Sequence, residues 1–221
     1  MDRAAWVAER RRLSEERFDT LHSRDYDEKW GVISESHLRW VRRVLGLCPP
    51  GGALLDAACG TGKFIGMALE AGLAVTGTDQ SRGMLARARA KYPDVQLEKT
   101  GLQELRYLGE FDVVMCVDAM ENVFPEHWPL VAGNLARAVR DGGYVYLTVE
   151  VAGDAERERM YAASLAAGVP ALPGEDAKIG YHYYPPDDGV RAWLARAGLE
   201  ILDEERADYY WHLLTRRTAR D

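Results

Sequence analysis

The chain has 221 residues, of which 47% are apolar and 29% are charged, a balance that predicts a folded globular protein rather than a disordered one. Its formal net charge of −7 argues against nucleic-acid binding, because that affinity depends mainly on Lys and Arg side chains that neutralise phosphates. The three cysteines are too few for a disulfide framework, and neither a signal peptide nor a membrane-spanning run is visible, so we expect a single-domain cytoplasmic protein.

The first half of the chain predicts helices and then a regular alternation of strands and helices. Two helical stretches are expected over residues 3–23 and 27–47, and the Pro and Gly residues at 49–52 end the second. Strands are expected at 53–56, 73–77, 95–97, 111–117 and 144–149, with helices up to about 71, at 81–91 and at 126–140, and a turn at 141–143. This alternation predicts βαβ units and a parallel sheet that is covered on both faces.

The last third follows a different pattern. A helix is expected at 154–167, an aromatic strand-like segment at 178–184 and a further helix at 186–197. Two strand-like segments then fill residues 199–214. Their short separation predicts an antiparallel pair at the edge of the sheet.

The segment Leu54–Phe64 has the pattern of a strand, a tight glycine turn and the start of a helix. Gly60 and Gly62 let the backbone adopt positive φ and pass close to a ligand. In doubly wound sheets such turns form nucleotide sites at the carboxyl ends of the strands. Asp79 ends the next strand, where a carboxylate can accept hydrogen bonds from both hydroxyls of a ribose. Together these features predict a ligand that contains adenosine.

Two departures from the dinucleotide fingerprint narrow the choice of ligand. That fingerprint has the form G-x-G-x-x-G. Gly60 and Gly62 supply its first two glycines, but the third position is Ile65, and Gly66 comes one residue later. Asp56 lies at the end of the first strand, where it would repel a pyrophosphate. A carboxylate there suits a cationic ligand such as S-adenosylmethionine, which carries an ammonium and a sulfonium.

At these positions the chain resembles the class I S-adenosylmethionine-dependent methyltransferases. The resemblance is carried by LLDAACGTGKF, which is similar to their first motif, by VTGTDQSRGMLARAR, by FDVVMCVDAMENV and by ARAVRDGGYVYLTVE. It covers residues 50–150 well and continues less closely through GVRAWLARAGLEILDE. It implies S-adenosylmethionine as the cofactor.

The resemblance also implies a set of cofactor-binding residues. The backbone at Ala58, Gly60 and Gly62 would hold the methionine portion, with Asp56 near its ammonium, and Asp79 would bind the ribose, with Gln80 and Met84 close to the adenine or ribose. Gly101 stands where the family often has an Asp that contacts adenine, so this contact is expected from Leu102 and Gln103. Asp118, after the fourth strand, completes the expected set.

The methyl acceptor is expected on the other side of the cofactor. The candidate catalytic residues are Glu121, Glu150 and His182. The alternative for the two glutamates is a solvated charge in a capping loop, and the alternative for His182 is a packing role. The candidate acceptor-binding residues are Tyr26, Trp30, Tyr183 and Tyr184, for which hydrophobic packing is the alternative. The scattered histidines predict no metal site.

We therefore expect an α/β fold: a Rossmann-like, doubly wound, seven-stranded and mostly parallel sheet with one antiparallel edge strand and an N-terminal helical cap. The expected parts are a cap or lid (1–50), a cofactor-binding core (51–150), a variable acceptor-side insertion (151–185), and a closing helix with edge strands (186–221).

The expected reaction is in-line transfer of a methyl group to a hydroxyl or amine of a small molecule, by a monomer or homodimer with no nucleic-acid or membrane partner. An NAD(P)-dependent Rossmann oxidoreductase and a non-catalytic cofactor-binding subunit are the alternatives.

Overall fold

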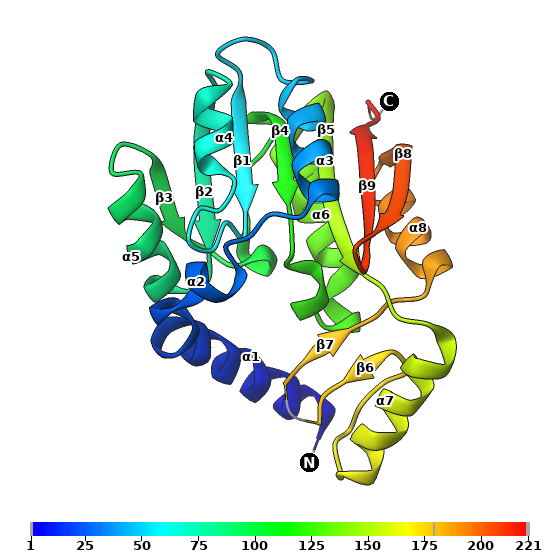
Figure 1. Ribbon diagram of the computed structural model, residues 1–221. Helices are drawn as coiled ribbons and strands as arrows, with labels where there is room; N and C mark the ends of the chain where they lie inside the picture. Colours follow the sequence, from blue (N-terminus) through cyan, green and yellow to red (C-terminus); the bar gives the residue numbers. More distant parts are fainter. Residues whose placement is uncertain (1, 179, 220–221) are drawn as a thin grey trace.

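A computed structural model describes residues 2–178 and 180–219, and at the centre of this part of the chain is a seven-stranded sheet (Figure 1). The strand order is β3-β2-β1-β4-β5-β9-β8. The strands are β1 (Ala53–Ala57), β2 (Ala74–Asp79), β3 (Gln96–Lys99), β4 (Phe111–Cys116), β5 (Val139–Glu150), β8 (Leu199–Ala207) and β9 (Tyr210–Arg217). Strands β1 to β5 pair in parallel, whereas β9 is antiparallel to β5 on one side and to the outermost strand β8 on the other. The predicted mostly parallel sheet with an antiparallel pair at its edge is confirmed.

Strand β5 begins earlier than the sequence pattern predicts. Residues 141–143 were expected to form a turn, but they lie within β5. The pairing with β4 steps from Phe111–Val139 to Val113–Tyr144, so the chain bulges out between these two pairs. Gly142 supplies a φ of 77° in this segment, and the glycines therefore mark a bulge inside the strand rather than its start.

Helices cover both faces of the sheet. They are α3 (Glu35–Leu45), α4 (Ile65–Glu70) and α5 (Arg82–Lys91) on one face, and α6 (Trp128–Ala138) and α8 (Asp187–Arg196) on the other. The consecutive residues Leu54 and Leu55 of β1 are both fully buried, and each belongs to the core of a different face. A strand that is buried on both sides reads as a continuous apolar run, which is the pattern seen in the sequence.

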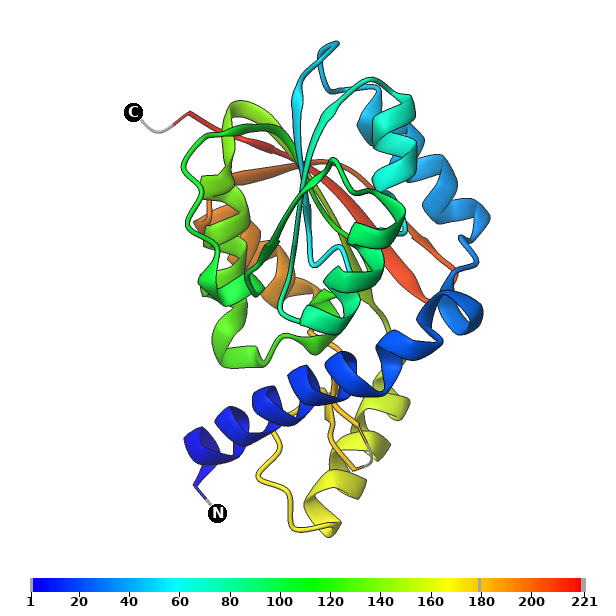
Figure 2. The same ribbon diagram turned by 90° about the vertical axis from the view of Figure 1, so that its left-hand side faces the viewer.

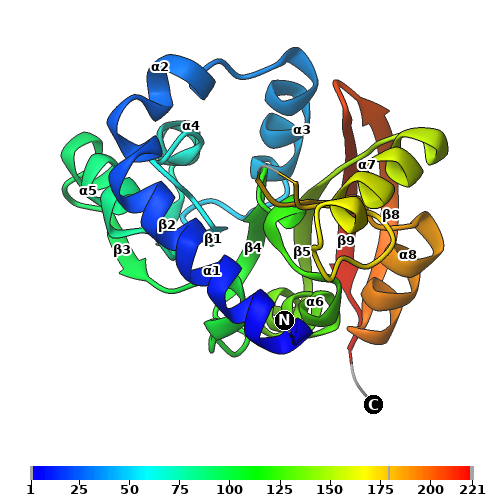
Figure 3. The ribbon, with the colours of Figure 1, turned by 90° about the horizontal axis from the view of Figure 1, so that it is seen from below.

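The remaining elements gather at the carboxyl ends of the parallel strands. They are α1 (Arg3–Thr20), α2 (Tyr26–Trp30), α7 (Asp154–Ala166), β6 (Glu175–Asp176), β7 (His182–Tyr183) and four short 3₁₀ helices, η1 (His22–Arg24), η2 (Leu102–Glu104), η3 (Met120–Asn122) and η4 (Pro125–His127). Helix α1 crosses this edge of the sheet, and α7 with the β6–β7 ribbon lies beside its N-terminal half (Figures 2 and 3). Trp6 of α1 packs edge-on against Phe124 and Tyr181.

In the part of the chain described, no helix has the length and apolarity needed to cross a membrane.

The stretch expected as one helix at 27–47 is two helices. The chain leaves the helical path between Trp30 and Glu35, and Ser34 starts α3 by accepting a hydrogen bond from the backbone N–H of His37. Helix α3 then packs its buried residues, Trp40 among them, on the sheet. Of the expected cap of residues 1–50, α1, η1 and α2 lie over the carboxyl edge, whereas α3 runs from this edge along a face of the sheet (Figure 1).

Candidate functional site

The glycine turn after β1 brings backbone to the carboxyl edge at the point where the strand order reverses between β1 and β4. Ala58, Gly60 and Gly62 all have positive φ, at 62°, 55° and 81°. A side chain at Gly60 would meet only the Cε atom of Met84, at 3.2 Å, whereas one at Gly62 would press on the ring of Tyr92 at 3.0 Å. Gly60 therefore faces open space for a ligand, and Gly62 permits close packing behind the turn.

Asp79 ends β2 and is fixed by two backbone groups. Its carboxylate accepts hydrogen bonds from the N–H groups of Gly60 at 2.9 Å and Ser81 at 2.8 Å. Burial raises its pKa to about 6, although these two bonds act in the opposite direction. Asp56 is buried behind it, and burial, followed by the charge of Asp79, raises the pKa of Asp56 to about 7. Two adjacent buried carboxyls thus lie under the glycine turn.

A cavity of about 650 Å³ opens at this edge between the sheet, α1, α2 and the start of α3. Thirteen of the predicted site residues line it: Tyr26, Trp30, Ala58, Gly60, Asp79, Gln80, Met84, Leu102, Gln103, Asp118, Glu121, Glu150 and His182. The other four predicted residues, Asp56, Gly62, Tyr183 and Tyr184, are outside its lining.

The two tyrosines illustrate how strand geometry separates neighbours. Successive residues of a strand point to opposite sides, so within β7 His182 faces the cavity while Tyr183 turns into the core. Tyr183 lies against Trp128, with 6.5 Å between the ring centroids. Tyr184 approaches the site indirectly, because its hydroxyl is 3.4 Å from Nδ1 of His182.

An acid–base pair lies on the cavity wall. Nδ1 of His182 is 2.7 Å from Oε2 of Glu150, the last residue of β5. The hydrogen bond to Glu150 raises the pKa of His182 against the opposing effect of burial. The carboxylate partner therefore favours the protonated form of the His182 ring.

Glu121 enters the cavity wall from η3 and is only 7% exposed. Its Oε1 atom accepts a hydrogen bond from the side chain of Asn122 at 2.9 Å. Its Oε2 atom is buried and has no hydrogen-bond partner among residues 2–178 and 180–219. Burial, and then the charge of Asp118, raises the pKa of Glu121 to about 8.

Asp118 is held in an unusual conformation by several contacts. Its φ is 52°, and its carboxylate lies 2.8 Å from Nε2 of His37 and 3.4 Å from Nζ of Lys63. Its backbone N–H donates to Oγ1 of Thr148. Burial alone would raise the pKa of Asp118, but the bond to His37 and the nearby positive charges outweigh it and hold that pKa below its usual range. Asp118 is therefore an ionised carboxylate with two basic neighbours.

Several cavity residues were missed by the sequence analysis. His37 and Ser34 come from the start of α3, Lys63 follows the glycine turn, and Asp208 and Tyr210 come from the β8–β9 hairpin. The position of Lys63 directly after the turn was a usable signal. The other four come from segments whose sequence patterns indicate only helix or strand.

In the described chain, no group of three or more His, Cys, Asp or Glu residues is arranged to hold a metal ion.

The fold and the cavity define a doubly wound α/β protein with a nucleotide-type site at its switch point, and comparisons with known proteins identify the family. A family model described as a methyltransferase domain matches residues 54–143. A phosphatidylethanolamine N-methyltransferase of Cereibacter sphaeroides is 31% identical over 186 residues, which are 81% of this chain and 84% of that protein. The chain belongs to the class I S-adenosylmethionine-dependent methyltransferases and uses S-adenosylmethionine.

Other relatives agree with this assignment over shorter or more distant matches. A ubiquinone biosynthesis O-methyltransferase of Thiobacillus denitrificans is 34% identical over 122 residues, which span 52% of this chain and 51% of that protein. Among solved structures, magnesium protoporphyrin IX methyltransferase from Synechocystis PCC 6803 with bound SAH has a TM-score of 0.69 at 18% identity. That match covers 93% of this chain and 98% of the other, and it shows that the whole fold is shared.

Proposed function

We propose that this methyltransferase transfers the methyl group to a nucleophilic oxygen or nitrogen of a small molecule by in-line displacement. The observation that carries the proposal is that one cavity joins the glycine turn and Asp79 to the Glu150–His182 pair. Its volume of about 650 Å³ lies in the range of small-molecule sites, about 300–1,000 Å³. Cofactor and acceptor can therefore occupy one continuous space.

The residues at one end of the cavity fit the cofactor. Asp79 keeps acceptor capacity on both oxygens after bonding two backbone N–H groups, so it can also accept hydrogen bonds from ribose hydroxyls. Gly60 leaves open space where the backbone would approach the methionine portion, next to Ala58. Asp118 supplies a carboxylate on the same wall.

The adenine side is built from the segments after β2 and β3. Gln80, Met84, Leu102 and Gln103 line this part of the cavity. The side chain of Asn134 fixes the backbone here by donating to the carbonyl oxygens of Leu102 and Gln103. Backbone and amide groups would then take the place of the Asp that Gly101 replaces.

Two predicted cofactor residues act from behind the cavity. Asp56 is buried under the turn, and Gly62 packs on Tyr92. Both would shape the turn rather than touch the ligand.

S-adenosylmethionine supplies a methyl group that its sulfonium already activates. The protein's part is to align the acceptor and exclude water, which in well-oriented systems contributes about 7–11 kcal/mol. A positioned base contributes roughly 10²–10⁴-fold more where the acceptor must lose a proton. The His182–Glu150 pair and Glu121 lie on the cavity wall and would perform that task.

Helices α1 and α2 would act as the lid that excludes water. Asp19 of α1 accepts hydrogen bonds from the Ser81 hydroxyl at 2.7 Å and the Gly83 N–H at 3.1 Å. Asp27 of α2 bonds Thr61 in the glycine turn and forms an ion pair with Arg87. These contacts dock the lid on the cofactor core, and Tyr26 and Trp30 would line its acceptor side.

A small-molecule acceptor is favoured by the relatives and by the charge. The two relatives described above are named for a lipid headgroup amine and for a ubiquinone intermediate, so nitrogen and oxygen both occur among them. The net charge of −7 disfavours a polyanionic acceptor.

The test combines a binding and a transfer measurement. Calorimetry should show that S-adenosylhomocysteine binds, and labelled S-adenosylmethionine with a cell extract should place the label in the small-molecule fraction. Label in RNA or protein would contradict the proposal, and binding without any transfer would favour a non-catalytic subunit. Family membership removes the oxidoreductase alternative.

A further inference from the structure

The acceptor end of the cavity contains a carboxyl group without a full set of partners. Glu121 is more than nine-tenths buried, lines the cavity, and has one oxygen with no hydrogen-bond partner in the described residues. An unsatisfied buried polar atom is costly, and native proteins leave few of them. A hydrogen-bond donor carried by a ligand would satisfy it.

The charges around Glu121 show which kind of donor is missing. The carboxyls of Asp118, Glu121, Glu150 and Asp208 line this part of the cavity. Asp118 has the basic partners His37 and Lys63, Glu150 has His182, and Asp208 accepts a hydrogen bond from Ser36. Glu121 receives a bond only from the neutral amide of Asn122 in the part of the chain that the structure describes. Glu121 is therefore a buried carboxyl with no basic partner among the described residues, and a cationic group on a ligand could supply one.

Two aromatic rings lie within electrostatic range of the same carboxyl. Tyr26 of α2 and Tyr210 of β9 both line the cavity. Burial raises the pKa of each phenol, and the charges of Glu121 and Asp118 raise it further. Aromatic faces attract cations, so the rings and carboxyls together form a site for a positively charged group.

Building on the proposed function, we propose that the methyl acceptor is an amine, which enters as an ammonium and is bound by Glu121 in the cavity that Tyr26 and Tyr210 also line. The Glu121 carboxylate takes one proton from the ammonium, which leaves a neutral amine with a free electron pair. That pair forms the new N–C bond as the S–C bond breaks and its electrons return to sulfur. The product is a methylated ammonium, and Glu121 holds the proton until it passes to solvent.

The acidity of Glu121 suits an amine better than a hydroxyl. Its pKa of about 8 lies within a few units of ordinary amines, for which model values run from about 8 to about 10. Proton transfer between groups so matched is efficient once Glu121 is ionised, which a pKa of about 8 places at mildly alkaline pH. An alcohol is far less acidic and would neither balance the charge nor occupy the cation site.

The experiment compares matched amines and alcohols on the protein saturated with S-adenosylhomocysteine. The probes are propylamine with propanol, phenethylamine with 2-phenylethanol, and octylamine with octanol, measured by calorimetry. At least one amine should bind about tenfold or more tightly than its alcohol, since hydrogen bonds to charged groups are worth roughly that much. With S-adenosylmethionine, the same amine should give the N-methyl product by mass spectrometry.

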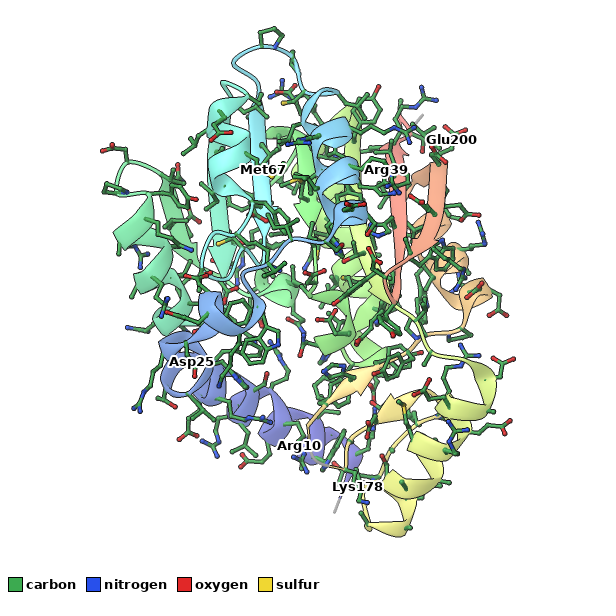
Figure 4. All side chains as sticks on the ribbon, in the orientation of Figure 1. Arg10, Asp25, Arg39, Met67, Lys178 and Glu200 are labelled. Carbon is green, nitrogen blue, oxygen red and sulfur yellow. The ribbon has the colours of Figure 1, made fainter. Side chains whose placement is uncertain are left out.

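Glu121→Gln removes the charge and keeps the shape. In this variant the preference for the amine should fall to about threefold or less. The matched control is Glu200→Gln, an exposed acid of β8 far from the carboxyl edge of the sheet (Figure 4), and it should keep the full preference. Thermal melting and S-adenosylhomocysteine affinity confirm that both variants are folded.

The outcomes separate this inference from the proposed function. The amine assignment is wrong if no amine binds better than its alcohol, or if the preference survives Glu121→Gln. Absence of S-adenosylhomocysteine binding, or transfer to a macromolecule, would instead count against the proposed function. Transfer to an alcohol with no amine preference would leave the function standing and overturn only the amine.

Discussion

Replacing Asp79 with Asn tests the cofactor site most directly. The native carboxylate accepts hydrogen bonds from two backbone N–H groups, at 2.9 and 2.8 Å, one on each oxygen. The amide of Asn has one oxygen, so one N–H group would face an NH₂ group instead. This conflict should cost about 1–3 kcal/mol of stability.

The loss of charge should also weaken the binding of S-adenosylhomocysteine, the product formed from the cofactor. Charge-assisted hydrogen bonds to the ribose are worth about 1.5–3 kcal/mol, which corresponds to roughly 10–150-fold in the dissociation constant of S-adenosylhomocysteine. Because the pKa of Asp79 is raised to about 6, the native carboxylate is ionised at pH 8 and mostly protonated at pH 5. The difference between the native protein and Asp79→Asn should therefore be large at pH 8 and small at pH 5.

Calorimetry at the two pH values measures this difference, and thermal unfolding shows whether the variant is folded. Asp203→Asn is the control, because Asp203 is an exposed acid of β8 paired with Arg43 and should leave the affinity unchanged. A folded Asp79→Asn protein that binds within about threefold of the native protein at pH 8 would refute the ribose role of Asp79.

Three further predictions concern stability and reactivity. Because the pKa of Asp56 is raised to about 7, the folded state keeps a proton that the unfolded state releases between about pH 4 and 7. The free energy of unfolding should therefore fall as the pH rises through this window. Urea unfolding at several pH values should show a weaker dependence of this free energy on pH in Asp56→Asn than in the native protein. In Gly83→Ala the new Cβ would lie 2.2 Å from the carbonyl oxygen of Asp19, so α1 should be displaced. The melting temperature should fall, and stopped-flow measurements should show faster release of S-adenosylhomocysteine. The control is Gly133→Ala, whose new Cβ has no atom within 4 Å, and its free energy of unfolding should stay unchanged or rise by about 0.5–1 kcal/mol. Burial raises the pKa of Cys116, which should react with a thiol reagent only after unfolding, and rapid labelling of the folded protein would contradict its burial.

Much of the fold could be predicted because its central strands leave strong local signals. Strands β1, β2 and β4 are largely buried runs with an acid at or next to the carboxyl end, namely Asp56, Asp79 and Asp118, and these ends must share one edge of a parallel sheet. The cofactor candidates were those that the resemblance to the family implies at these strand ends, and most of them line the cavity. The bulge at 141–143 was misread because glycines mark turns and bulges alike.

The acceptor side was predicted less completely, because its residues are brought together by tertiary packing. Tyr183 was selected with His182 on composition, but adjacent strand residues cannot both face the cavity. His37 and Tyr210 lie on α3 and β9, and their rings meet at 4.9 Å only after both elements pack on the sheet. Nothing local in either segment distinguishes these residues from ordinary packing residues.

The same arrangement explains how acceptor choice could change without loss of the cofactor site. Asp79 and Gly60 are joined to each other by hydrogen bonding within the core, whereas Tyr210 and Asp208 belong to the β8–β9 hairpin, which reaches the cavity beside α3. The hairpin is tied there by a hydrogen bond from Ser36 to Asp208. Substitutions in the hairpin would therefore alter this part of the cavity wall and leave the bonds of the glycine turn intact, so acceptor affinity and cofactor affinity should vary independently.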